Sequence, residues 1–108
     1  MVSENKNVQD NEMVVVIDPE LEDLIPGFIN NRRKDVIKMQ AALQDSDFEA
    51  IRILGHSMKG AGGGYGFDVI TDIGRAIETA AAEKNTQMLN DQIHLLSHFI
   101  ENVEVRYE

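Results

Sequence analysis

Apolar residues recur at helical spacing in four successive segments of this chain, and this periodicity is the feature that most restricts the fold. The spacing predicts a helix of about 18 residues from Pro26, a second helix after Ser46 or Asp47, a third from Phe67 to about Lys84 and a fourth from about Thr86 to Val105. Short connections make sequential helices pack as neighbours, so the sequence predicts an all-α fold, an antiparallel four-helix bundle. The apolar stripes of the four helices are, in order, Phe28, Ile29, Val36, Met39 and Leu43; Ile51, Leu54, Met58 and Ala61; Ile70, Ile73, Ile77, Ala80 and Ala81; and Leu89, Ile93, Leu96, Ile100 and Val103.

The segment before the bundle is polar at first. Residues 1–12 have no periodic apolar face, so we expect a flexible lead-in there and the bundle domain over residues 13–108. Asp18-Pro19 predicts the start of a short extra N-terminal helix through about Leu24, with Asp as the N-cap and Pro in the first turn. Residues 14–17 are strand-like in composition, but no alternating partner is visible downstream, so no strand is predicted.

Composition excludes several classes of protein. The chain has 108 residues, enough for one domain, and no cysteine for disulfides or thiolate chemistry. It has no apolar run near the roughly 20 residues that cross a bilayer, and its polar start lacks a signal-peptide core, so a cytoplasmic location and no membrane partner are expected. A net charge of −9 argues against nucleic acid. The initial Met favours a free-standing protein, and because one bundle uses all the apolar stripes, a monomer is expected.

The segment GHSMKGAGGGYG, residues 55–66, places six glycines around one histidine and one lysine. On a helical wheel the apolar residues of this helix occupy a sector of about 80°, and His56 lies on the opposite side. The exposed stripe around His56 holds Arg52, Lys59, Gly60 and Gly63. Glycine in a helix costs roughly 1 kcal/mol relative to alanine, so glycines there are expected to serve another purpose, the close approach of a second protein to the imidazole.

The remaining glycines of this segment are harder to place. Gly62 and Gly64 neither flank His56 nor line the core centre, and tight helix packing is the suggestion that is left for them. Tyr65 and Gly66 mark the end of the helix.

The residue types on the exposed stripe suit a phosphate carrier. Histidine has an unperturbed pKa near 6.5, which leaves a neutral, nucleophilic nitrogen at pH 7. A lysine one turn away can donate to a dianionic group on the imidazole and neutralise it. His56 and Lys59 therefore predict a reversible phosphoryl group on the histidine.

The stretch HSMKGAGGGYGF, with an Ile77-Glu78 pair further on, resembles the motif of histidine phosphotransfer (HPt) domains of bacterial two-component phosphorelays. The resemblance covers about residues 18–105 and implies a four-helix bundle with an exposed histidine that exchanges a phosphoryl group with an aspartate of a response-regulator receiver domain. Met58 stands where leucine is usual, and the run GGG stands where small residues are mixed.

The resemblance also implies roles for single residues. His56 is the phosphoacceptor, Lys59 stabilises the phosphate, and Gly60 leaves the histidine accessible. The residues expected to contact the partner are Arg52, Gly63 and Gly66. A receiver domain and a hybrid histidine kinase are the expected partners. The chain is expected to need no cofactor or metal of its own, since the receiver supplies Mg²⁺, and to have no ATP-dependent kinase activity.

Other interpretations stay open beside this one. The glycine run differs from a phosphate-binding loop. Such a loop follows a strand and its lysine comes after the glycines, whereas here the lysine precedes them. His94 and His98, with Asp91 and Glu101 near them, have the spacing of metal ligands, but a solvated helix face is expected. The run NNRRKD is also expected to be a solvated face, part of which can rim the partner surface. The alternative function is a non-phosphorylated helical module that binds a receiver or kinase, and the presence of both His56 and Lys59 argues against it.

Overall fold

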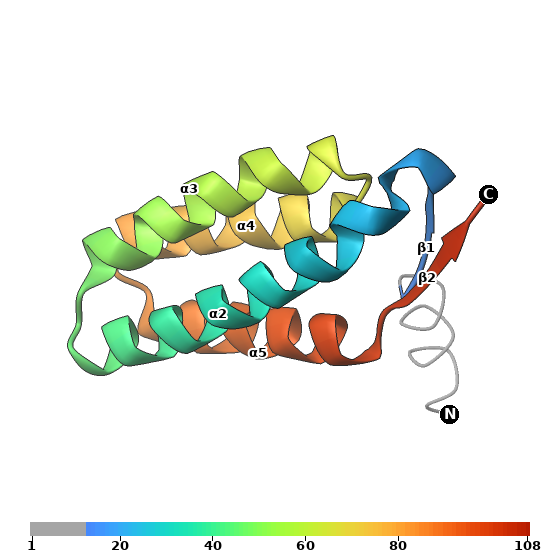
Figure 1. Ribbon diagram of the computed structural model, residues 1–108. Helices are drawn as coiled ribbons and strands as arrows, with labels where there is room; N and C mark the ends of the chain where they lie inside the picture. The colour runs from blue at the N-terminus through green and yellow to red at the C-terminus, as the bar shows by residue number, and fades with distance from the viewer. Residues whose placement is uncertain (1–12) are drawn as a thin grey trace, which may run out of the picture.

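The computed structural model describes residues 13–108, and the predicted lead-in of residues 1–12 lies outside the described residues. Within them, four α-helices follow one another: α2 (Ile25–Gln44), α3 (Phe48–Gly64), α4 (Asp68–Ala82) and α5 (Thr86–Asn102). The helices run alternately along the bundle, with α3 and α4 as one pair and α2 and α5 as the other (Figure 1). This confirms the predicted antiparallel four-helix bundle. None of these helices has the length and apolarity that a membrane crossing requires.

Polar side chains define the starts of two helices. Asp47 accepts a hydrogen bond from the Ala50 amide at 3.1 Å and caps α3, whereas Ser46 lies in the connection with a φ of 56°. Asn85 caps α5 by accepting from the Met88 amide at 3.0 Å. Of the two predicted caps for α3, the structure therefore selects Asp47.

The predicted apolar stripes meet along the axis of the bundle. At the end where α3 joins α4, Phe67 is fully buried between the rings of Phe28 and Phe99, with ring centroids 5.1 Å and 6.4 Å away. These aromatic contacts connect α2 and α5 to the α3–α4 connection. The stripe residues that are fully or nearly fully buried are Phe28, Ile29, Val36, Met39, Ile51, Met58, Ile70, Ile73, Ile77, Ala80, Ala81, Leu89, Ile93, Leu96 and Ile100, and the partly buried ones are Leu43, Leu54, Ala61 and Val103.

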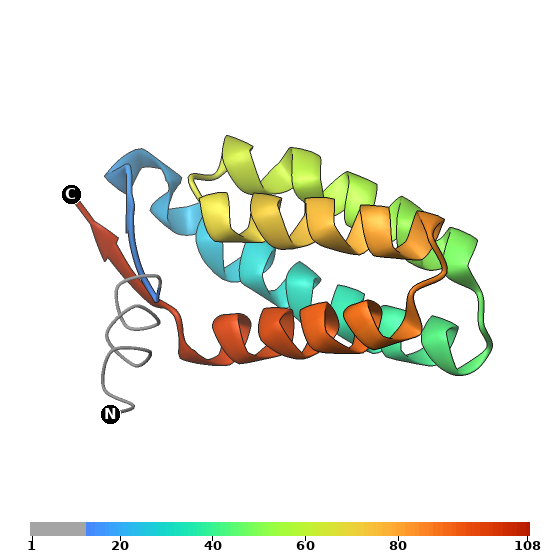
Figure 2. The same cartoon turned by 180° about the vertical axis from the view of Figure 1, so that it is seen from behind.

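The expectation that no strand forms near the N-terminus was wrong. β1 (Val14–Ile17) pairs in parallel with β2 (Glu104–Tyr107), with Val14 opposite Glu104 and Ile17 opposite Tyr107. Consequently α5 ends at Asn102, before the predicted Val105. The two strands lie side by side beyond the end of α5 (Figure 2). The bundle brings the two distant segments together, which is why no local hairpin signal announces the pair.

The predicted short N-terminal helix is present as a 3-10 helix, η1 (Pro19–Leu24). The Asp18 side chain accepts from the Glu20 amide at 2.9 Å, as expected of its N-cap. Ile17, just before this turn, is buried, so β1 and η1 cover one end of the bundle.

Candidate functional site

Glycines set the distance between α3 and α4. A Cβ atom on Gly74 would lie 2.7 Å from the Lys59 amide nitrogen and 2.9 Å from the Gly55 carbonyl oxygen, so no larger residue fits without moving a helix. A Cβ on Gly62 would lie 2.6 Å from Thr71 Oγ1. Tight helix packing is therefore confirmed for Gly62. It was the wrong explanation for Gly64, whose Cβ would meet nothing within 4 Å.

The close crossing brings one carboxylate of α4 to two side chains of α3. Glu78 Oε2 lies 2.9 Å from His56 Nδ1, and Glu78 Oε1 lies 2.8 Å from Lys59 Nζ. The His56 side chain is 66% exposed, whereas that of Glu78 is 22% exposed. Each oxygen of one carboxylate thus holds a different side chain on the edge of the bundle, and the imidazole remains open to solvent.

The carboxylate decides which nitrogen of His56 carries the proton. The pKa of Glu78 lies below its ordinary value of 4.5, mainly because the carboxylate accepts a hydrogen bond from Lys59 and, to a smaller extent, one from His56. This group is therefore ionised at neutral pH. An ionised carboxylate only accepts hydrogen bonds, so the neutral imidazole donates from Nδ1. The lone pair is then on Nε2, the nitrogen that Glu78 does not contact.

The family model of the Hpt domain matches residues 23–105. The chain belongs to the Hpt domain family. The comparisons with curated proteins and with solved structures found no match. As an Hpt domain, the chain is a histidine phosphotransfer module of phosphorelays. Hpt domains are phosphocarriers rather than kinases, and they interact with receiver domains and histidine kinases.

The other predicted site residues of this Hpt domain differ in their contacts with the rest of the bundle. A Cβ atom on Gly60 would meet nothing within 4 Å, and a Cβ atom on Gly63 would meet only Thr71 Oγ1, at 3.6 Å. Packing therefore does not require glycine at either position. Arg52 is engaged by Glu49 through two hydrogen bonds of 2.9 Å and 2.6 Å, which raise the pKa of its guanidinium. Arg52 thus shares the exposed stripe of His56 but is paired along its own helix.

Gly66 lies apart from the histidine, after the end of α3. Its φ of +87° belongs to the left-handed region, where glycine is favoured, and its Cβ position faces Ile17 Cδ1 at 3.0 Å. This glycine has a structural reason to be where it is, namely the turn from α3 into α4 beneath β1.

Glu78 was not predicted as a site residue, although the Ile77-Glu78 pair is part of the sequence resemblance to HPt domains. It ends a stripe of α4 in which Thr71, Gly74 and Glu78 follow one another at intervals of three and four residues. Thr71 donates to the Lys59 carbonyl at 3.2 Å, so this stripe faces α3 along its length. Two small residues followed by an acid at helical spacing are the signal that could have pointed to Glu78.

The competing interpretations find little support in this Hpt domain. Glycines 60–64 lie inside α3 rather than in a loop after a strand. Over residues 13–108, no three potential metal ligands come together, and His98 Nδ1 lies 3.3 Å from Asn102 Nδ2 instead. The prediction that NNRRKD is a solvated face was wrong in part. Asp35 is buried and pairs with Arg32 at 2.8 Å, and the Arg32 guanidinium lies over the Phe28 ring.

Proposed function

We propose that His56 of this Hpt domain accepts a phosphoryl group on Nε2 and exchanges it with the aspartate of a response-regulator receiver domain. The observation that supports this most directly is the Glu78 contact, which leaves the Nε2 lone pair on an imidazole that is 66% exposed. A nucleophile at the surface suits a reaction in which the phosphoryl donor and the groups around it belong to another protein.

The step exchanges one bond to phosphorus for another. The Nε2 lone pair attacks the phosphorus of the receiver's aspartyl phosphate in line, the Nε2–P bond forms, and the P–O bond to the aspartate breaks. The aspartate leaves as a carboxylate. Nδ1 keeps its proton throughout and donates a hydrogen bond to Glu78. The carboxylate of Glu78 thereby stabilises the positive charge that the ring acquires. Phosphoryl transfer in the opposite direction reverses each of these changes.

Lys59 is proposed to stabilise the phosphoryl group. Its ammonium has three donors, one of which is used by Glu78 at 2.8 Å. The others are available to the phosphoryl oxygens one helical turn away. We further propose that the receiver supplies Mg²⁺ and that a hybrid histidine kinase is the other phosphoryl partner. Gly60 would leave room for the receiver beside the imidazole, and Arg52, Gly63 and Gly66 would contact the partner.

The test uses a phosphorylated receiver domain with Mg²⁺. The parent protein is expected to become labelled with an acid-labile, base-stable phosphoryl group, and His56→Gln is expected to remain unlabelled. His94→Gln, which removes another exposed histidine, serves as the matched control and should be labelled normally. Lys59→Ala should slow the transfer by roughly tenfold, the effect of losing one charge-assisted hydrogen bond.

The alternative function is an interaction module that binds a receiver or kinase without being phosphorylated. It predicts that the parent binds the receiver but takes up no label. Equal labelling of the parent and His56→Gln would instead overturn the assignment of His56.

A further inference from the structure

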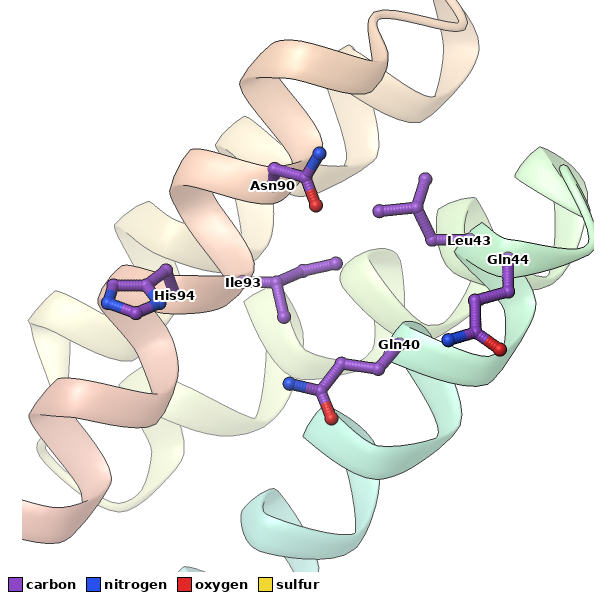
Figure 3. A pocket seen from close by; sticks show the side chains of 6 residues that line it. All are labelled: Gln40, Leu43, Gln44, Asn90, Ile93 and His94. Atoms are coloured by element: carbon purple, nitrogen blue, oxygen red, sulfur yellow. The ribbon is translucent and has the colours of Figure 1, made fainter.

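A groove on the face away from His56 is not used by the proposed phosphoryl transfer. It runs between α2 and α5 as two depressions of about 450 Å³ and 230 Å³ that share Gln40, and we call it the α2–α5 groove. Figure 3 shows the larger one, where Gln40 and Leu43 of α2 extend toward Asn90 and Ile93 of α5. The His56–Glu78 contact joins α3 to α4, the opposite pair of helices (Figure 1). A ligand in the groove would therefore leave the phosphorylation face free.

The floor of the α2–α5 groove is apolar and its rim is polar. Val36, Ile93 and Ile100 are buried core residues that also line the depressions. Ile37, on the rim, is 65% exposed, although isoleucine is a residue type that is usually buried. Gln40, Gln44 and Asn90 contribute amide groups that both donate and accept hydrogen bonds. An apolar floor with an adaptable polar rim is typical of a site for an amphipathic segment.

One wall of the groove, α2, carries a charge opposite to that of the whole chain, whereas the other wall, α5, holds Asp91 and Glu101. The net charge is −9, yet α2 holds four of the ten basic residues, Arg32, Arg33, Lys34 and Lys38, against the single carboxylate of Asp35. Arg32 is engaged by Asp35 and Arg33 by Glu101, at 2.8 Å and 3.0 Å. Lys34 and Lys38 form no ion pair with any of residues 13–108. They lie four residues apart on the stripe of α2 next to Ile37.

We propose that the α2–α5 groove docks an acidic amphipathic helix of a partner protein. Apolar side chains of that helix would cover Ile37 and the floor, and its carboxylates would pair with Lys34 and Lys38. From Arg33 to Gln44, α2 extends over about 16 Å, which is roughly three turns of a docked helix. Two near-antiparallel helices present a groove into which the side-chain ridges of a third helix fit. The partner would thereby hold this carrier by one face while His56 meets its receiver on the other.

Charge distinguishes this occupant from a second copy of the chain. A two-fold dimer through the groove would bring the basic faces of both α2 helices into one interface, and like charges at close range are unfavourable. An acidic helix meets complementary charge at this surface.

The test titrates two synthetic helical peptides of about three turns, followed by the amide NMR spectrum of the whole chain. Both peptides carry leucines on one face, and the remaining positions are glutamate in one and lysine in the other. The glutamate peptide is expected to shift the amide signals of Gln40, Leu43, Asn90 and Ile93 and to leave those around His56 unchanged. The lysine peptide is expected to bind elsewhere or not at all. The net charge of −9 opposes binding of the glutamate peptide, so net charge would not explain its attachment to the groove.

Variants then test the two parts of the site. The double substitution Lys34→Glu, Lys38→Glu is expected to weaken binding of the glutamate peptide by roughly tenfold. Ile37→Ser, at an exposed position that the fold tolerates, should weaken it as well. Arg75→Glu, a single charge reversal on α4 compared with the single variants Lys34→Glu and Lys38→Glu, is the control and should leave the affinity unchanged. The proposal is overturned by shifts centred on α3, by equal binding of both peptides at the groove, by no shift with either, or by groove shifts that depend on protein concentration alone, which would identify a second copy as the occupant.

Discussion

Gly55 and Gly74 face each other where α3 and α4 cross, and a Cβ atom on either residue would lie about 3 Å from the carbonyl oxygen of the other. His56 follows Gly55 directly, and Glu78 lies one turn after Gly74. The crossing therefore sets the separation of the two helices at the same level at which Glu78 reaches His56 Nδ1. Because of this arrangement, the stability of the bundle and the geometry of the histidine depend on the same small residues.

Replacing Gly74 tests the crossing. Gly74→Ala is expected to lower the free energy of unfolding by roughly 1–3 kcal/mol, because the added methyl group meets backbone atoms that cannot rotate away. Gly64→Ala is the control, since its Cβ enters open space and alanine favours the helix. Urea denaturation of both variants measures the difference. A Gly74→Ala variant as stable as Gly64→Ala would contradict the close approach.

Adding bulk beside the histidine tests the role of Gly60. Gly60→Gln is expected to keep the fold, since nothing lies within 4 Å of its Cβ position, but to slow phosphoryl transfer from the receiver by roughly tenfold or more, because reacting groups must approach closely. Gly64→Gln adds the same side chain one turn further from His56 and should transfer normally. The rates are compared in single-turnover labelling. If both variants react at the parental rate, the access argument for Gly60 is wrong.

Removing the carboxylate tests how His56 is oriented. Glu78→Ala is expected to slow phosphoryl transfer by roughly tenfold, the value of one lost hydrogen bond, and to raise the fraction of imidazole with its proton on Nε2. Nitrogen chemical shifts of the ring report this fraction. Glu78→Gln should partly restore the transfer rate and the fraction of imidazole with its proton on Nδ1, because the glutamine amide oxygen still accepts a hydrogen bond from Nδ1. Asp72→Ala removes a carboxylate of α4 that pairs with Arg75 instead and should change neither quantity.

The ion contacts of Glu78 also predict a dependence of stability on pH. Lys59 and then His56 lower the pKa of this carboxyl group in the folded protein below 4.5. The folded state thus favours the ionised form, and the stabilisation is present above the ordinary value and is lost as pH falls through the lowered folded value. Denaturation of the parent and of Glu78→Gln across this range should give curves that differ at neutral pH and converge in acid. If the difference in stability between the parent and Glu78→Gln is the same in acid as at neutral pH, the ionisation of Glu78 is not its cause.

The parallel strand pair predicts an effect at the C-terminal end of the chain. The Glu104 amide donates to the Met13 carbonyl at 2.6 Å, and Glu104→Pro removes this donor. Val103 already has an extended backbone with ψ of 136°, so proline can follow it without strain there. We expect Glu104→Pro to destabilise the fold by about 1 kcal/mol or more in thermal unfolding. Glu104→Ala, which keeps the amide but removes the side chain that pairs with Arg106, should have little effect.

The features that were predicted correctly depend on short stretches of chain. The period of the α-helix assigns Ile51 and Met58 to one face and His56 to the other before any tertiary contact forms, and the structure has the same two faces. Asp18 and Asp47 cap helices through amides two or three residues away. The four-helix bundle then follows from four amphipathic helices joined by short connections.

Tertiary structure decided the remainder, because these features depend on how distant segments are placed. The β1–β2 pair joins residues near opposite ends of the chain, and Val14 has no neighbour in sequence that indicates Glu104 as its partner. The contact of Glu78 with His56 depends on the register between α3 and α4, which the glycine crossing sets and no helical wheel contains. The sequence by itself determined that a histidine stands on an exposed helix face. Packing of a second helix decided which of its two nitrogens is free, because the carboxylate that holds the other one comes from 22 residues away.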